Sequence, residues 1–175
     1  MLKNEQHVNL LPSPWVERFA GLIRDGGHVL DVACGSGRHS HLCAARGHSV
    51  TAIDRDISRL EPADNITGIE LDLESGAPFA LAGQRFDGIV VTNYLWRPLI
   101  PDLIQALTPG GVLIYETFAL GNEKFGKPRN PDHLLAPGEL LAAVAPSELV
   151  VMAYEHGEVS TPTPSVRQRI CAKKP

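Results

Sequence analysis

The amino-acid sequence predicts an α/β protein in which a mostly parallel sheet carries helices on both faces. Three observations lead to this class. Short apolar segments alternate with segments of helical spacing along the chain. Segment 86–92 is almost continuously apolar, as expected of a strand buried in the middle of a parallel sheet. A glycine-rich turn at 33–37 joins one such strand to a helix, which is typical of folds that bind nucleotides.

The first half of the chain is expected to hold three strands. The expected elements are a helix at 15–23, a strand at 28–32, a helix at 37–46, a strand at 49–53, a short helix near 57–60 and a strand within 66–73. Gly26 and Gly27 stop the first helix, and Gly47 closes the second as a left-handed C-cap. The short helix near 57–60 should end before Pro62.

The second half is expected to complete the sheet. Its expected elements are a strand at 86–92, a helix at 99–107, a strand at 112–118, a helix at 138–144 and strands at 149–154 and 166–172. The last two should form an antiparallel hairpin at the sheet edge. Between 119 and 137, glycine, asparagine and proline interrupt every periodic pattern. A segment of this length in a compact domain is often functional, so we expect a substrate lid there.

Bulk composition limits the classes of function. A chain of 175 residues with 43% hydrophobic and 21% charged residues is expected to form one domain, 1–175, with a substantial core. The net charge of −4 argues against broad binding of nucleic acid, which usually needs a basic face, although a local basic strip stays compatible with it.

Cysteine usage and the N-terminus indicate the compartment. Three cysteines without Cys-x-x-Cys spacing indicate reduced thiols, with neither a disulfide framework nor a zinc site, and no other metal site is expected. Segment 1–7 lacks the apolar region of a signal peptide, and no stretch approaches the ~18 apolar residues of a membrane span. We therefore expect a soluble, cytoplasmic protein without a membrane partner.

The most informative segment is 29–40, where an apolar strand ends, a glycine loop follows and a helix begins. Gly35 and Gly37 carry no Cβ, so backbone N–H groups of this loop can approach a ligand closely. A second apolar strand ends on Asp54, where an adenosine ribose would offer its hydroxyls. Glycines also occur in such turns for packing alone, so the loop has to be weighed with its neighbours.

Three acids strengthen the ligand-binding interpretation. Asp31, Asp54 and Asp72 lie at the carboxyl ends of three successive expected strands. Parallel strands end at the same edge of a sheet, and open α/β sheets bind ligands at that edge. A single strand-end aspartate is usually a helix N-cap, but three in succession predict a common site.

A dinucleotide is the natural rival ligand. The pattern Gly35-x-Gly37-x-x-Ser40 lacks the third glycine of dinucleotide-binding turns. A pyrophosphate would also bring two negative charges close to Asp31. A ligand with an amine and a sulfonium suits this acidic environment better, which favours S-adenosylmethionine over NAD.

With these residues in place, the chain resembles the class I S-adenosylmethionine-dependent methyltransferases over nearly its whole length. Segments that match the five motifs of the family, in order, are 29–37, 51–56, 69–73, 86–94 and 107–113. The stretch 34–40 is further similar to tellurite-resistance and thiopurine-type methyltransferases, and the segment from Tyr115 onward resembles small bacterial methyltransferases. The resemblance implies a Rossmann-like, seven-stranded, mostly parallel sheet with an antiparallel C-terminal strand.

The resemblance also implies a cofactor site for S-adenosylmethionine. The implied roles are Asp31 toward the methionine amine, the loop residues Ala33, Cys34, Gly35 and Gly37 around the cofactor, Asp54 on the ribose hydroxyls, Asp72 and the backbone N–H of Leu73 on the adenine, Arg55 or Ile57 over an adenine face, and Thr92, Asn93 and Tyr94 beneath the sulfonium. Arg38 is expected to pair with the cofactor carboxylate or with the acceptor, with a solvated ion pair as the alternative.

The reaction expected of such a site is an in-line displacement at an activated methyl group, for which the protein mainly aligns the acceptor and excludes water. Asn93 and Tyr94 are candidate catalytic residues because an amide or a phenol can orient an acceptor, although Tyr94 could equally be a packing residue. His133 in the lid segment is a candidate general base by residue type, since histidine is a common general base at neutral pH, although a loop histidine is often plain surface. Glu116 is a further lid candidate.

The leading hypothesis is therefore an enzyme, monomeric or a weak homodimer, that methylates a small molecule. A non-catalytic S-adenosylmethionine-binding module or partner subunit is the alternative from another class. An NAD-dependent oxidoreductase is a third, less favoured reading. The expected lid and the polar end of the fourth strand favour the enzyme, because a mere binding module would need neither.

Overall fold

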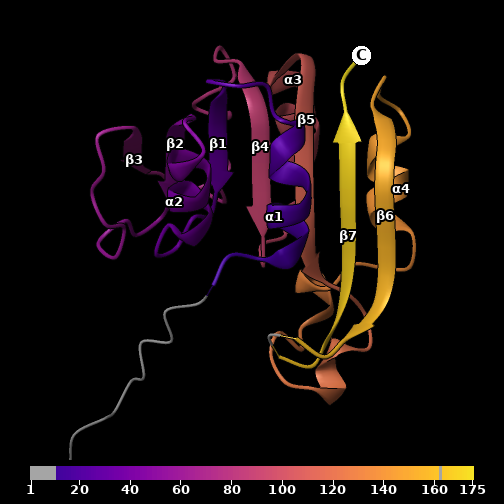
Figure 1. Cartoon of the computed structure of the whole chain (residues 1–175). Coiled ribbons are helices and arrows are strands. Elements are labelled where there is room, and N and C mark those ends of the chain that lie inside the picture. The colour runs from indigo at the N-terminus through magenta and orange to yellow at the C-terminus, as the bar shows by residue number, and fades with distance from the viewer. Residues whose placement is uncertain (1–10, 162) are drawn as a thin grey trace, which may run out of the picture.

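The fold is known from a computed structural model, which describes residues 11–161 and 163–175. The expected absence of a signal peptide in segment 1–7, and the first ten residues of the predicted single domain, lie outside the described residues. One seven-stranded sheet organises the chain, with the strand order β3-β2-β1-β4-β5-β7-β6 (Figure 1). Strands β1 to β5 run parallel to one another, and β7 runs antiparallel to both β5 and β6. This confirms the predicted fold class.

The element bounds follow the sequence pattern closely. The strands are β1 His28–Val32, β2 Ser49–Asp54, β3 Ile66–Glu70, β4 Phe86–Thr92, β5 Leu107–Phe118, β6 Val150–Val159 and β7 Ser165–Lys173. The α-helices are α1 Pro14–Phe19, α2 Arg38–Ala45, α3 Ile100–Ala106 and α4 Glu139–Val144. Short 3₁₀ turns are η1 Ala20–Leu22, η2 Arg97–Leu99, η3 Asn122–Lys124 and η4 Pro131–His133.

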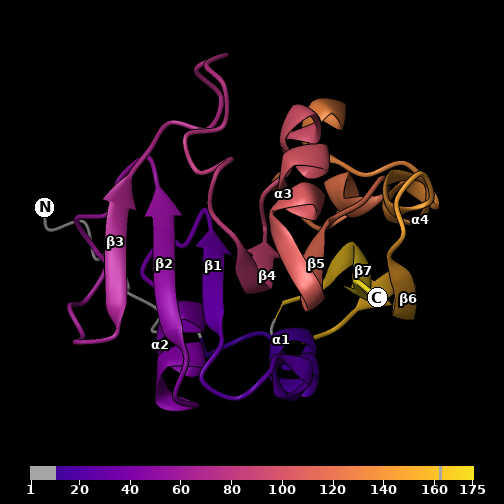
Figure 2. The ribbon, with the colours of Figure 1, turned by 90° about the horizontal axis from the view of Figure 1, so that it is seen from above.

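Two hydrophobic cores lie on opposite faces of the sheet. Seen from above, α1 and α2 cover one face, and α3 and α4 cover the other (Figure 2). The sheet has a core on each face because successive side chains of a strand point to opposite faces of the sheet. Val90 of β4 belongs to the core under α1, while its neighbours Ile89 and Val91 belong to the core under α3 and α4. Both cores hold the carboxyl ends of the strands in fixed register.

The predicted helix near Ile57–Leu60 is wrong, because this segment forms turns. Local side-chain acceptors compete with the helix there. Asp54 Oδ1 accepts from the backbone N–H of Asp56 at 3.1 Å, and Asp56 Oδ1 accepts from that of Ser58 at 2.9 Å. Such bonds give the backbone an alternative to helical pairing.

The start of β5 also differs from the prediction. The strand begins at Leu107, five residues before the predicted Val112, and passes through the Pro-Gly-Gly segment expected to precede it. Its pairing with β4 is interrupted, since Phe86 pairs with Leu107 and Gly88 pairs with Val112. The intervening residues bulge out of the ladder, so turn-forming residues are tolerated inside the strand.

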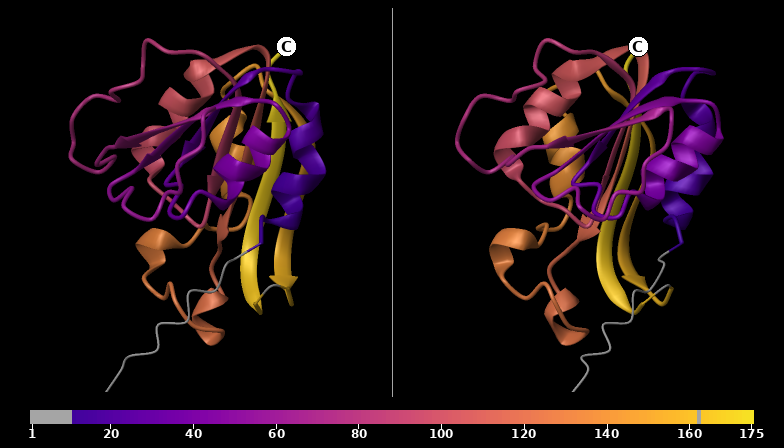
Figure 3. Two further views of the ribbon diagram at one scale, coloured as in Figure 1. Left: turned by 60° about the vertical axis from the view of Figure 1, so that its left-hand side comes forward. Right: turned by 90° about the vertical axis from the view of Figure 1, so that its left-hand side faces the viewer.

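The predicted lid, segment 119–137, is irregular apart from two 3₁₀ turns and one isolated bridge between Ala119 and Leu135. It lies below the sheet in Figure 1 and beside the lower ends of the strands in Figure 3. Asn122 is buried, donates to the carbonyl of Pro128 and accepts from the backbone N–H of Val166. The segment is therefore docked against β7. Glu116, expected to belong to the lid, lies inside β5 instead.

The described part of the chain contains no helix long and apolar enough to cross a membrane.

Candidate functional site

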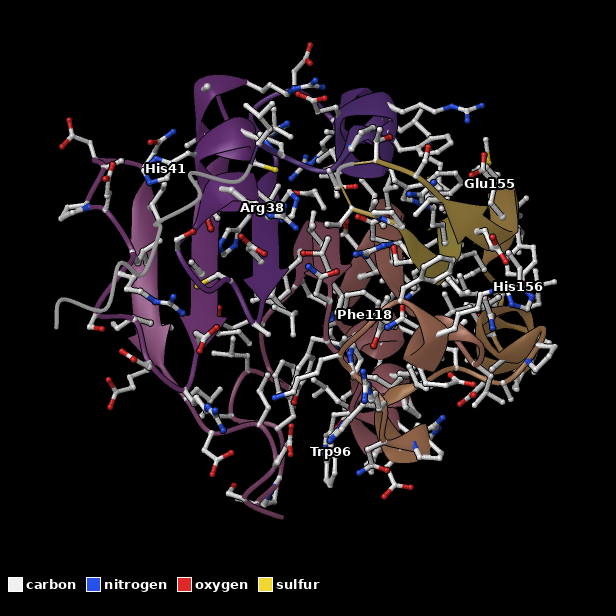
Figure 4. The ribbon with its side chains drawn as sticks, turned by 90° about the horizontal axis from the view of Figure 1, so that it is seen from below. Arg38, His41, Trp96, Phe118, Glu155 and His156 are labelled. Carbon is white, nitrogen blue, oxygen red and sulfur yellow. The ribbon has the colours of Figure 1, made fainter. Side chains whose placement is uncertain are left out.

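A large cavity opens at the carboxyl ends of the parallel strands, with a volume of about 900 Å³. Figure 4 looks onto this edge of the sheet, with Arg38 on the side of α2 and Trp96 on the opposite side. The residues that line the cavity are Ala33, Asp54, Arg55, Leu71, Asp72, Leu73, Glu74, Asn93, Tyr94, Leu95, Thr117, Phe118, Pro128 and His133. This volume lies in the range of small-molecule and cofactor sites.

Eight of the predicted site residues line this cavity. They are Ala33, Asp54, Arg55, Asp72, Leu73, Asn93, Tyr94 and His133. The others lie behind its wall or beside it. Asp31 and Thr92 are buried beneath the strand ends, Gly35 and Gly37 form the adjoining turn, and Arg38 lines a neighbouring cavity.

Asp54 ends β2 and is held in a defined orientation. Its Oδ2 accepts from the backbone N–H of Gly35 at 2.8 Å, while Oδ1 accepts from Asp56. Each carboxylate oxygen can accept more than one hydrogen bond, so both keep acceptor capacity toward the cavity. The arrangement joins the first and second sequence motifs and suits a pair of neighbouring hydroxyl groups.

Asp31 is buried, at 2% exposure, directly behind the glycine turn. Burial raises its pKa to about 6, although a 2.6 Å hydrogen bond from Ser40 Oγ and the charge of Arg38 act in the opposite direction. The prediction that all three aspartates share one cavity is therefore only partly matched in this structure. Asp54 and Asp72 line it, whereas the Asp31 carboxylate faces Ser40 inside the protein.

The outer rim of the cavity is acidic. Asp72 lies two residues beyond the end of β3, where its Oδ1 accepts from the backbone N–H of Glu74 at 2.9 Å. The lining contains three acidic side chains, Asp54, Asp72 and Glu74, and one arginine, Arg55. This charge distribution favours a ligand that carries positive charge over one that carries phosphates.

Backbone strain is concentrated at the same edge. Ala33 follows β1 with φ of 53°, and Asn93 follows β4 with φ of 55°. These are the non-glycine residues with positive φ in the described part of the chain. Positive φ is costly for residues with a Cβ and gathers at functional sites, where the surrounding structure enforces it. Both residues line the cavity, which supports this edge as the site.

The two glycines of the turn differ in their surroundings, because a Cβ on Gly35 would meet no atom within 4 Å, whereas Gly37 is closely packed. Gly37 has a φ of 81°, and a Cβ on it would lie 2.3 Å from Leu60 Cδ1. Cys34 is buried, and burial raises the pKa of its thiol to about 12, so it stays protonated at neutral pH. This agrees with the reading of Cys34 as a loop residue and not a nucleophile.

Tyr94 and His133 line the cavity from two different segments, the end of β4 and the predicted lid. The Tyr94 hydroxyl is buried and has no hydrogen-bond partner among the described residues. Burial, and the nearby carboxylates of Glu74, Asp72 and Asp54, raise its pKa, so the phenol keeps its proton. His133 ends η4 in the predicted lid. Tyr94 thus lines the cavity with its side chain, while its hydroxyl is enclosed near the carboxylate of Glu74.

Several lining residues were missed by the sequence analysis. Leu71, Glu74, Leu95, Thr117, Phe118 and Pro128 line the cavity without having been predicted. Most adjoin predicted residues along the chain, so extending each motif by one or two positions would have found them. Phe118 ends β5, and its position depends on the pairing of β5 with β4 and β7.

Comparisons with known proteins agree with this geometry. A family model described as a methyltransferase domain matches residues 29–111. A ubiquinone biosynthesis O-methyltransferase from Azotobacter vinelandii is 35% identical over 125 residues, which cover 63% of this chain and 51% of the relative. The chain thus spans about half the length of the curated relatives with this description.

Solved structures share the fold. TehB from Haemophilus influenzae superimposes with a TM-score of 0.74 at 19% identity, over 97% of this chain and 64% of that one. The glycopeptide N-methyltransferase MtfA, solved with S-adenosylhomocysteine, gives a TM-score of 0.64 at 22% identity, over 91% of this chain and 88% of that one.

The family match, the relative and the shared fold agree with a class I S-adenosylmethionine-dependent methyltransferase, the class expected from the sequence. The expectation drawn from the five motifs is confirmed at this level. The matched segment contains the glycine turn, the three acids of the cavity rim and the polar end of β4.

Proposed function

We propose that this protein transfers the methyl group of S-adenosylmethionine to a small-molecule acceptor by in-line displacement. The observation that carries the proposal is one cavity in which Asp54 and Asp72 lie with Asn93, Tyr94 and His133. The acids would recognise a nucleoside, and the polar groups at the end of β4 and in the lid would meet an acceptor. A non-catalytic binding module would need only the acids that recognise the nucleoside.

Each residue of the cofactor set has a physical reason for its role. Asp54 would accept from the two ribose hydroxyls, because its oxygens are already oriented by backbone donors. Asp72 would accept from the adenine amine, with the Leu73 backbone N–H and the Arg55 side chain beside the ring. Asp31 would act from beneath the turn on the methionine amine, through the loop or through water.

The cofactor supplies a methyl group already activated by a positively charged sulfur. The protein then has to position the acceptor and exclude water. Asn93 and Tyr94 would orient the acceptor, because both line the cavity at the end of β4. His133 would accept a proton from an acceptor that arrives protonated.

The acceptor class also belongs to the proposal. Three curated relatives are named ubiquinone biosynthesis O-methyltransferases, whereas another, from Nostoc punctiforme, is named a ribosomal RNA small subunit methyltransferase. The net charge of −4, which gives this chain little electrostatic attraction for nucleic acid, favours the small-molecule acceptor. The three cysteines are free and buried thiols, which supports a reducing compartment such as the cytoplasm.

The test uses S-adenosylmethionine with a deuterated methyl group. Purified protein is incubated with it and with a small-molecule extract, and in parallel with a total RNA fraction. We expect deuterated methyl groups to appear in extract compounds and S-adenosylhomocysteine to accumulate. Cofactor binding in calorimetry without product from either fraction would instead identify a non-catalytic binding module. Binding of NADH without binding of the sulfonium donor would identify an oxidoreductase.

A further inference from the structure

A second cavity, of about 440 Å³, adjoins the first at the ends of β4 and β5. Asn93 and Phe118 line both cavities, so a molecule in one can contact a molecule in the other at these residues. The second cavity is lined on one side by residues 11–14 before and at the start of α1, and on the other by β7. Figure 4 shows Arg38 and Phe118 at this part of the strand ends.

Guanidinium groups dominate the second cavity. Arg38, Arg167 and Arg169 line it, against the carboxylates of Glu17 and Glu116. Arg169 forms an ion pair with Glu116, with 3.0 Å between Nε of Arg169 and Oε2 of Glu116. Arg38 and Arg167 form no ion pair with any described residue.

Arg167 is the more deeply placed of these two, with 8% of the residue exposed. Its Nη1 donates to Asn93 Oδ1 at 2.6 Å and its Nε donates to Ser165 Oγ at 3.0 Å. The guanidinium carbon lies 4.3 Å from the ring centroid of Phe118. Nη2 has no hydrogen-bond partner among the described residues, so one edge of the fork stays available to a ligand.

Arg38 uses one donor on the backbone carbonyl of Leu11, at 3.0 Å, and leaves the rest of its fork without a partner among the described residues. Burial lowers the pKa of both Arg38 and Arg167, and the carboxylate of Glu116, which already pairs with Arg169, offsets this effect on both only in part. A partly buried cation without an anion is costly, and an anionic ligand would offset that cost.

We infer that the second cavity holds the methyl acceptor, and that this acceptor carries a carboxylate or similar anionic group on an apolar body. Arg38 and Arg167 would bind the anionic group, because a guanidinium fork matches a carboxylate in two parallel hydrogen bonds. Pro12, Pro14 and Phe118 would contact the apolar body. Asn93, held by Arg167, would then stand between acceptor and donor. This inference rests on the proposed function and deepens it.

The test compares two probes of the same shape, para-fluorobenzoate and para-fluorobenzamide, by fluorine NMR with saturating S-adenosylhomocysteine. We expect the carboxylate to bind about tenfold or more tightly than the amide, because only it is charged. Arg38→Gln should abolish this preference, as should Arg167→Gln. Arg85→Gln is the matched control, since Arg85 is exposed before β4, at the opposite edge of the sheet.

Calorimetry with S-adenosylhomocysteine on every variant separates this inference from the function on which it rests. Lack of binding to the unmodified protein would overturn both together. Normal binding with equal affinity for the two probes, or an equal effect of Arg38→Gln and Arg85→Gln, would overturn the anionic acceptor alone. Substitution of the buried Arg167 can also unfold the protein. The side chain of Arg38 is half-buried, so Arg38→Gln alone is sufficient to test whether the cavity prefers an anionic acceptor.

Discussion

At the scale of single residues, Asp54 shows how a carboxylate is prepared for a ligand before the ligand arrives. Two backbone N–H groups, of Gly35 and Asp56, fix its two oxygens. Because the group is already oriented, little rotamer freedom remains to be lost on binding.

Asp54→Ala should therefore weaken S-adenosylmethionine binding by roughly 1–3 kcal/mol, the cost of leaving polar partners unpaired. Isothermal calorimetry measures the change directly. Asp25→Ala, on an exposed turn before β1, serves as the matched control and should bind like the unmodified protein. An unchanged dissociation constant for Asp54→Ala would remove this residue from the site.

His39 links the start of α1 to the end of β4. Its Nε2 accepts from the backbone N–H of Ser13 at 3.0 Å, and its Nδ1 lies 3.3 Å from Thr92 Oγ1. The two bonds together require the tautomer with the proton on Nδ1. Burial lowers the pKa of His39 to about 3, with a further contribution from Arg38.

A pH dependence of stability follows from this shift. Below the unfolded-state pKa near 6.5, the unfolded chain binds a proton that folded His39 excludes, so stability falls as the pH falls from about 6.5 toward 3. Asp31 acts with the opposite sign, because its raised pKa lets the folded state bind a proton between about pH 6 and 4. Only a variant of His39 separates the two effects.

We expect unmodified protein to lose roughly 2 kcal/mol relative to His39→Gln when the pH is lowered from about 7.5 to about 5. Gln keeps an acceptor for Ser13 but does not titrate. Urea unfolding of both proteins at the two pH values gives the comparison, with His156→Gln on the exposed edge strand as control. Parallel pH profiles for His39→Gln and the unmodified protein would show that His39 is not buried as the neutral form.

The sequence predicts some residues of the site much better than others. Asp54 and Asp72 were found because each follows an apolar strand, and parallel strands bring such positions to one edge. Arg167 was missed because β7 is antiparallel. Its place beside Asn93 follows from the insertion of β7 between β5 and β6, and no local pattern in the chain encodes that pairing.

At the scale of elements, the same distinction between local and long-range information holds. The bounds of β1 and β4 match the prediction, because apolar runs between turn signals define them locally. The turn at 57–60 and the early start of β5 were missed for different reasons. The first depends on the Asp54 and Asp56 carboxylates, and the second on a bulge that only the partner strand reveals.

One side chain, that of Arg97, holds the predicted lid in place through hydrogen bonds. Arg97, at the start of η2, donates to the backbone carbonyls of Asp132 at 2.7 Å and Leu134 at 2.9 Å. The same guanidinium pairs with Glu139, whose Oε2 accepts from the backbone N–H of Ala136 at 2.7 Å. His133 lies within this clasped stretch, so its position at the cavity depends on Arg97.

Arg97→Lys should loosen the segment, because a single ammonium cannot replace a planar fork that reaches three acceptors. We expect faster amide hydrogen exchange at 132–136 and a fall in methyl transfer of about tenfold from the misplaced lid. Affinity for S-adenosylhomocysteine should change far less. Arg85→Lys provides the control. If cofactor affinity fell as far as turnover, the segment would be part of the nucleoside pocket and not a substrate lid.

At the scale of the whole molecule, the two cores make the carboxyl edge of the sheet a rigid frame. Helices on both faces hold β1, β2 and β4 in register, so the groups at their ends keep their spacing without a ligand. The second cavity, which we propose holds the methyl acceptor, is built from other parts of the chain. It is assembled from residues 11–14, the end of β5 and β7, together with Arg38 and Asn93 from the neighbourhood of the cofactor motifs.

A ligand that spans several strand ends should stabilise the whole domain, because it binds the folded state and not the unfolded chain. S-adenosylhomocysteine at about one hundred times its dissociation constant should add roughly 2.7 kcal/mol. For a chain of 175 residues, this corresponds to a rise of about 7 °C in the unfolding midpoint.

NADH at the same concentration should leave the midpoint unchanged, because its pyrophosphate would meet the acidic rim formed by Asp54, Asp72 and Glu74. Differential scanning calorimetry with each ligand makes the comparison on the intact chain. Asp54→Ala provides an internal check, since its midpoint should rise less with S-adenosylhomocysteine in proportion to the lost affinity. A larger rise with NADH than with S-adenosylhomocysteine would reverse the assignment of the cavity, because a pyrophosphate would then bind beside three acidic side chains in preference to the sulfur-containing nucleoside.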